Sequence, residues 1–138
     1  MRIGKHERET LENAIYAMAK FKEVFGRDLE PSFVAELYAF NKLGLEICDT
    51  RNELGFDAID NKGRRYQIKY RSPGTPNVDI NNFNFDYVVL VNVDDKFLVS
   101  GMWLATIGQA KEIFTLREKF RKNQVTQKKL KSVAKFIT

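Results

Sequence analysis

The spacing of apolar residues predicts two helices at the start of the chain. Over residues 7–25, apolar side chains recur every three or four positions, the period of an amphipathic helix (Leu11, Ala14, Ile15, Met18, Phe21 and Phe25). The stretch "GRDLEP" interrupts this pattern. Pro31 suits the first turn of a second helix, which we expect to run to about Leu43 and to end in a left-handed cap at Gly44.

Short apolar runs predict a sheet in the middle of the chain. We expect three short strands at "LEICD" (45–49), "GFDAID" (55–60) and "RRYQIKYR" (64–71). The turn "DNKG" suits a hairpin between the last two, because Gly63 readily takes a positive φ. The nearly continuous apolar run "DYVVLVNV" (86–93) is typical of a central strand, and "DDKFLVSGMW" follows as its neighbour. Residues 72–85 are rich in Pro, Gly and Asn, which predicts a long loop.

The remaining pattern is helical and completes one domain. Thr106 and Gln109 resemble a capping box that opens a helix to about Lys122, and a last helix follows Thr126. The expected fold is α/β, with a mixed sheet of about five strands flanked by helices. A chain of 138 residues suits one compact domain. We therefore expect a single domain over 1–138, with an N-terminal helix at 7–25 and a basic C-terminal helical segment at 106–138.

Composition excludes several classes of protein. With 43% hydrophobic and 12% aromatic residues, the chain is typical of a folded globular protein. No apolar run approaches the roughly 18 residues of a membrane span, and the charged N-terminus lacks a signal-peptide core, so we expect a cytoplasmic protein without a membrane partner. The single cysteine and single histidine exclude an intrachain disulfide and a Cys/His zinc site.

The net charge of +5 is unevenly distributed. Residues 108–138 have a net charge of +7, from nine Lys and Arg residues against two Glu, whereas the rest of the chain has a net charge of −2. Such a basic segment is typical of contact with a polyanion, and equally of a solvated helix face. If the partner is a nucleic acid, the lysines of the tail would follow its backbone (Lys128, Lys129 and Lys131).

Polar residues on the predicted hairpin are the first candidates for chemistry. Gln67 and Lys69 share one face of their strand because side chains alternate with a period of two. Asp57 lies on the partner strand, within cross-strand reach. Arg65 and Arg71 flank them on the same face. A half-exposed hairpin with an ordinary polar face has the same pattern, so these residues alone leave both interpretations open.

Glu36 adds a carboxylate from the second helix. It lies three residues after Phe33 and four before Phe40, and therefore on their apolar stripe. A carboxylate on such a stripe is costly unless it is paired or metal-bound. We expect it to face Gln67 and Lys69, although it also has the alternatives of reaching water at the edge of the stripe or pairing with Lys69.

Together these four residues have the composition of a magnesium-dependent phosphodiester-cleaving site. Two carboxylates and an amide oxygen suit Mg²⁺ (or Mn²⁺), which prefers oxygen ligands. A bound metal ion can activate water and neutralise the charge of the leaving oxygen. Lys69 can position the attacking water or stabilise the developing charge.

The ordered pattern of helix, strand, hairpin and apolar strand resembles the PD-(D/E)xK nuclease superfamily. The resemblance extends from about Phe33 to Trp103 and is to the variant with glutamine at the second acidic position. The segments "AELYA", "GFDA", "QIKYR" and "GMW" are also similar to those of a small bacterial and phage family. The resemblance implies a restriction-endonuclease-like fold and a DNA-cleaving hydrolase.

The resemblance also implies the role of each site residue. Asp57 would be the central metal ligand and Lys69 the catalytic lysine, while Glu36 and Gln67 would complete the metal shell. Gln67 carries no charge, so the site should hold Mg²⁺ less tightly than one with a second carboxylate. Arg71 and Arg65 would contact phosphates. A homodimer is expected by analogy, since two sites are needed to cut both strands.

Two other functions fit the same pattern. The chain can be a non-catalytic nucleic-acid-binding module on this fold, since fold does not determine function. It can also be an accessory subunit that binds another protein. Dependence of activity on metal and on Lys69 distinguishes the nuclease from both.

Overall fold

The computed structural model describes residues 2–48 and 55–138, which form two compact units divided after Glu30. The first unit contains helix α1 (Lys5–Phe25), in agreement with the predicted helix over 7–25. Gly26 ends α1 with a φ of 69°, and its amide donates a hydrogen bond to the carbonyl of Lys22 at 2.8 Å. Glycine adopts this left-handed conformation without the steric cost that a Cβ atom adds.

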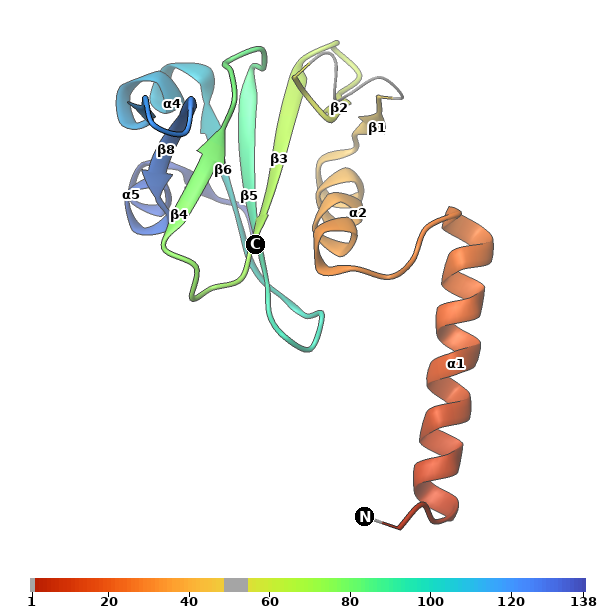
Figure 1. Ribbon diagram of the computed structural model, residues 1–138. Helices are drawn as coiled ribbons and strands as arrows, with labels where there is room; N and C mark the ends of the chain where they lie inside the picture. The colour runs from red at the N-terminus through yellow and green to blue at the C-terminus, as the bar shows by residue number, and fades with distance from the viewer. Residues whose placement is uncertain (1, 49–54) are drawn as a thin grey trace. The chain divides into compact units, whose positions relative to one another are not determined.

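The second unit, residues 31–138, is an α/β fold with two sheets (Figure 1). Its helices are α2 (Pro31–Leu43), α4 (Ile107–Ile113) and α5 (Gln127–Val133). Its strands are β1 (Glu46–Ile47), β2 (Ala58–Ile59), β3 (Arg65–Arg71), β4 (Asn77–Ile80), β5 (Tyr87–Val93), β6 (Val99–Thr106), β7 (Thr115–Arg117), β8 (Lys122–Thr126) and β9 (Lys135–Phe136). The predicted strand over 45–49 corresponds to β1, and its last residue, Asp49, lies outside the described residues.

The larger sheet is mixed and has six strands in the order β1-β2-β3-β5-β6-β9. Strands β3 and β5 are parallel, and the other neighbours are antiparallel. The smaller sheet is antiparallel, with the order β4-β8-β7. In Figure 1, α2 covers one side of the larger sheet, and the smaller sheet lies on the other side with α4 and α5. The α/β class with a mixed sheet is therefore confirmed, and the smaller sheet was not predicted.

The two faces of β3 and β5 have different neighbours. Tyr66 and Ile68 of β3 pack with Ala35, Ala39 and Phe40 of α2 in one buried cluster. Val88 and Leu90 of β5 belong to a second cluster with residues of β4, β8, α4 and α5 (Val78, Ile80, Val125, Ala110 and Leu130). Strand β5 is thus apolar on both faces, as predicted for a central strand.

Two segments differ from the sequence prediction. The predicted loop over 72–85 contains β4, which pairs with β8. The predicted helix from Thr106 to Lys122 ends at Ile113, and the chain continues into the β7–β8 hairpin. The basic segment 106–138 is therefore a mixture of two short helices and three strands rather than helical throughout. The physical reason is tertiary: Val125 of β8 pairs with Val78 of β4, far away in the sequence.

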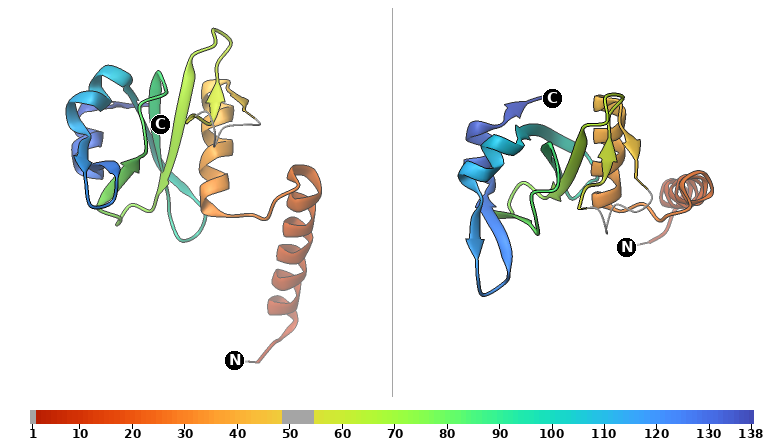
Figure 2. Two further views of the ribbon diagram at one scale, coloured as in Figure 1. Left: turned by 45° about the horizontal axis from the view of Figure 1, so that its top comes forward. Right: turned by 90° about the horizontal axis from the view of Figure 1, so that it is seen from above.

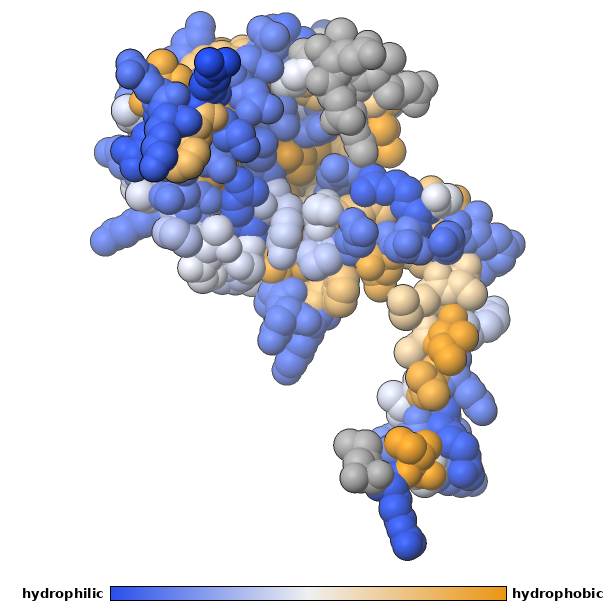
Figure 3. All heavy atoms as spheres, viewed as in Figure 1, coloured by the Kyte–Doolittle hydropathy of each residue, from blue (hydrophilic) through white to orange (hydrophobic). Residues whose placement is uncertain are grey.

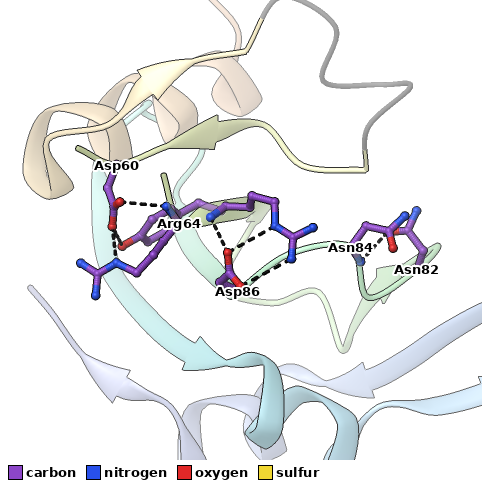
Figure 4. A network of polar contacts seen from close by, with 7 residues as sticks. Asp60, Arg64, Asn82, Asn84 and Asp86 are labelled. Carbon is purple, nitrogen blue, oxygen red and sulfur yellow. Dashed lines mark hydrogen bonds and ion pairs between the residues drawn. The ribbon is translucent and has the colours of Figure 1, made fainter. Parts of the chain in front are cut away.

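The β2–β3 hairpin is held by a polar network at its turn (Figure 4). Gly63 has a φ of 76°, as the turn requires. The Asp60 carboxylate accepts hydrogen bonds from Arg64 Nε at 2.6 Å and Tyr66 Oη at 3.0 Å. Burial raises the pKa of Asp60, but the hydrogen bonds from Arg64, Lys62 and Tyr66 outweigh it and lower the pKa to about 2. The network therefore fixes the hairpin that carries the candidate site.

Candidate active site

Asp57 and Gln67 lie opposite each other at the edge of the β2–β3 ladder. Ala58 pairs with Tyr66 in this ladder, so Asp57, one residue earlier, stands across from Gln67. Gln67 Nε2 donates a hydrogen bond to Asp57 Oδ2 at 3.1 Å. The same oxygen accepts the backbone N–H of Ile68 at 2.7 Å. The aspartate is thus held by the next strand, and its carboxylate lies on the face that carries Gln67.

Lys69 lies on the same face of β3, away from α2. In the parallel ladder, Gln67 is paired with Val88 and Lys69 with Leu90, and both partners belong to the second buried cluster. Burial lowers the pKa of Lys69, and the charge of Arg71 lowers it further, while Asp57 and Asp79 act in the opposite direction. The ammonium group is thus partly desolvated and interacts electrostatically with Asp57 and Asp79, an environment that is common for functional lysines.

Asp79 is a further acidic residue near the site, and the sequence analysis did not identify it. It lies on β4, where its Oδ1 accepts a hydrogen bond from Gln124 Nε2 at 2.8 Å. Its Oδ2 is 3.8 Å from a terminal nitrogen of Arg71. The alternation of Val78, Asp79 and Ile80 was the available signal for a half-buried strand, but it lies in a stretch rich in turn residues.

Glu36 is half-buried on α2, between the buried residues Phe33 and Phe40, as its spacing predicted. The helix itself packs against the face of β3 that carries Tyr66 and Ile68. The apolar stripe of the helix therefore pairs with the apolar side of the strand, and the contact expected between Glu36 and the face of Gln67 and Lys69 stays a prediction. A metal-binding role for Glu36 stays a prediction from the sequence.

The two arginines that flank the site have partners within the fold. Arg65 forms an ion pair with Asp86, whose Oδ2 is 3.3 Å from Arg65 Nε (Figure 4). Arg71 donates hydrogen bonds from Nε to the carbonyl of Asn77 at 3.0 Å and from Nη1 to that of Tyr70 at 2.6 Å. Both guanidinium groups therefore brace the sheet, and their contact with phosphate stays a prediction.

The lysines of the tail divide into two kinds. Lys128 and Lys129 are exposed on α5. Lys131 Nζ instead donates to Asn92 Oδ1 at 2.5 Å and lies 4.3 Å from the centre of the Trp103 ring. Burial lowers the pKa of Lys131. We therefore retain Lys128 and Lys129, but not Lys131, as proposed phosphate contacts.

The donor set of Asp57 and Gln67 fits a hard cation. Oxygen ligands at about 2.1 Å from Mg²⁺ lie about 3 Å apart when they are adjacent in an octahedral shell. The distance between Gln67 Nε2 and Asp57 Oδ2 is 3.1 Å. Rotation of the Gln67 amide by half a turn would place its oxygen where the nitrogen stands, so that two oxygens could share one ion. The remaining ligands would be water and substrate oxygens, as is usual for Mg²⁺.

Over residues 2–48 and 55–138, no three His, Cys, Asp or Glu side chains form a group that could hold a metal ion. The proposed pair differs from such a group because one donor is an amide.

In the same part of the chain, every helix is too short or too polar to span a bilayer. A comparison with models of known protein families and one with curated proteins gave no match.

Proposed function

We propose that the chain is a metal-dependent nuclease that hydrolyses DNA on the face of Asp57, Gln67 and Lys69. The observation that carries the proposal is the contact of Asp57 with Gln67. Lys69, whose ammonium group is partly desolvated, lies on the same face two residues after Gln67. The composition of the site and the resemblance to PD-(D/E)xK nucleases support the proposal.

Each site residue would have its own role in hydrolysis. Asp57 and Gln67 would hold Mg²⁺ or Mn²⁺, with Glu36 as a further proposed ligand. The bound ion would polarise the phosphate and lower the pKa of a water molecule. Lys69 would bind a non-bridging phosphate oxygen and stabilise the negative charge that develops as water attacks. Lys128 and Lys129 would attract the nucleic acid through its phosphates.

Substitution of Lys69 by methionine tests the proposal. The side chain stays unbranched, becomes one atom shorter and loses its charge, so Lys69→Met is expected to lower the cleavage rate by about 10²–10³-fold, the usual effect of removing one group that stabilises a developing oxyanion. Purified protein is incubated with plasmid, linear and branched DNA, and with RNA, in the presence of Mg²⁺ or Mn²⁺. Nicked and linear plasmid are measured separately, because cutting of both strands in one event supports a homodimer.

The matched control is Lys62→Met in the exposed turn of the same hairpin. It removes one positive charge without touching the site, so its cleavage rate should equal that of the wild type. Equal rates for wild type and Lys69→Met on every substrate would contradict the nuclease. Salt-sensitive binding that is indifferent to metal and to Lys69 would instead support a non-catalytic nucleic-acid-binding module.

A further inference from the structure

The β7–β8 hairpin forms a basic arm on the second unit. Its residues Thr115–Thr126 include four cationic side chains and one carboxylate (Arg117, Lys119, Arg121, Lys122 and Glu118). In the right-hand view of Figure 2, the two strands project beyond the rest of the α/β unit. Figure 3 shows the upper left region of the molecule, where these elements lie, as mainly hydrophilic surface with smaller apolar areas between. A basic two-stranded arm suits a polyanionic ligand.

One face of the arm continues onto β4, whose Asp79 contacts Arg71 of β3. Arg117 pairs with Lys122, and Thr115 with Gln124, so these four side chains share a face of the ribbon. Gln124 is also paired with Asp79 of β4 and donates its hydrogen bond there. The charge of Lys122 contributes to the lowered pKa of Lys69. Printed contacts therefore connect Arg71 of β3 to Asp79 of β4, and Asp79 to Gln124 on the face of the arm that carries Arg117 and Lys122.

A hollow of about 420 Å³ lies on this face, lined by Asp79, Arg117, Phe120, Lys122 and Gln124. Its volume is within the range of about 300–1,000 Å³ that is usual for ligand pockets. The Asp79 carboxylate is engaged by Arg71 and Gln124, which reduces its repulsion of an anionic ligand. The charge in the hollow therefore favours an anion.

Phe120 gives the hollow an aromatic wall. The residue is 61% exposed at the tip of the hairpin, where Phe120 N donates to the carbonyl of Arg117 at 3.0 Å and Arg121 takes a φ of 51°. An exposed ring next to cationic side chains has the composition of a nucleotide platform, on which a base stacks while the cations hold its phosphate. Bases within a duplex are already stacked on both sides, so a ring of this kind receives a base that is unpaired.

We propose that the β7–β8 arm binds one unpaired nucleotide of the substrate, with the base stacked on Phe120 and the phosphate held by Arg117 and Lys122. The substrate class is then a nucleic acid with a single-stranded segment beside the bond that is cut. The choice of ligand rests on the proposed nuclease function. The test of this proposal measures nucleic-acid binding in EDTA, without cleavage. Failure of the nucleotide-binding proposal is then distinguishable from failure of the nuclease proposal.

The test uses Phe120→Ala with Leu116→Ala as its matched control. Leu116 is 57% exposed, close to the value of Phe120, and its strand position places it on the opposite face from Arg117. Fluorescence anisotropy measures the affinity of each full-length variant for a labelled single strand, the same strand with abasic sites, and the corresponding duplex. Phe120→Ala is expected to weaken binding of the normal single strand by roughly 5- to 100-fold, the range for one base stack. Leu116→Ala should bind like the wild type.

The abasic strand separates stacking from charge. Wild type and Phe120→Ala should bind it equally, because no base is present to stack. Equal binding of the normal strand by both alanine variants would overturn the proposal, as would an equal loss on the duplex or the absence of any nucleic-acid binding. Intact single-strand binding without cleavage would contradict the nuclease and leave this inference standing.

Discussion

Replacement of Asp57 by asparagine is expected to abolish metal-dependent cleavage, with a loss of at least about 10³-fold. The reason is that the carboxylate is the only charged ligand in the Asp57–Gln67 pair. A metal ion contributes several kcal/mol of transition-state stabilisation, and each 1.36 kcal/mol is tenfold in rate, which sets the scale of about 10³ for this loss. Initial rates of plasmid nicking over a series of Mn²⁺ concentrations measure the effect.

The fold should survive this substitution. The asparagine side chain keeps an oxygen that can accept the backbone N–H of Ile68, the bond that Asp57 Oδ2 accepts at 2.7 Å. The thermal unfolding midpoint therefore reports whether any lost activity is due to unfolding. Asp95→Asn, at an exposed position after β5, is the matched control and should leave the rate unchanged. An Asp57→Asn protein that cuts as fast as this control would contradict a catalytic role for Asp57.

Asn92→Leu is expected to destabilise the second unit. Asn92 is 1% exposed in the central strand β5. Its Nδ2 donates to the carbonyl of Arg71 at 3.1 Å and to Gln127 Oε1 at 2.8 Å, and its Oδ1 accepts from Lys131. Leucine has a similar volume but would leave these partners without their hydrogen bonds. Because a buried group that loses its partner costs about 1–3 kcal/mol, we expect a loss of about 2–4 kcal/mol in the free energy of unfolding.

Urea unfolding measures this loss. Asn61→Leu, in the exposed turn between β2 and β3, makes the same chemical change and should alter the free energy of unfolding by less than about 0.5 kcal/mol. If Asn92→Leu were as stable as this control, the polar cluster around Asn92 would not hold β5 to α5. The same result would remove the reason for assigning Lys131 an internal role rather than a phosphate contact.

Local chemistry made much of the first part of the second unit predictable. Pro31 at the start of α2, Gly44 with a φ of 63° after its end, and Gly63 at the hairpin turn all determine the backbone through short-range effects. The same is true of the side-chain alternation that places Gln67 and Lys69 on one face. A period of two needs no knowledge of the rest of the fold.

The remainder depends on partners distant in sequence. Strand β4 offers only Val78 and Ile80 as an alternating pair, and it forms by pairing with β8. The segment after Ile113 has an apolar spacing that also suits a helix, until the pairing of Val78 with Val125 extends it as a strand. Asp79 was missed because its strand was missed. Likewise, the sequence gives no sign that Lys131 reaches the buried amide of Asn92.

Titration with Mn²⁺ tests whether oxygen atoms of Asp57 and Gln67 share a divalent cation beside Lys69. Electron paramagnetic resonance measures free Mn²⁺ as it is titrated into wild type and Asp57→Asn at equal protein concentration, without nucleic acid. We expect saturable binding of Mn²⁺ by the wild type that is lost in Asp57→Asn and kept in Asp95→Asn. Equal Mn²⁺ binding by all three proteins, or binding by none of them, would rule out a cation held by Asp57 and Gln67.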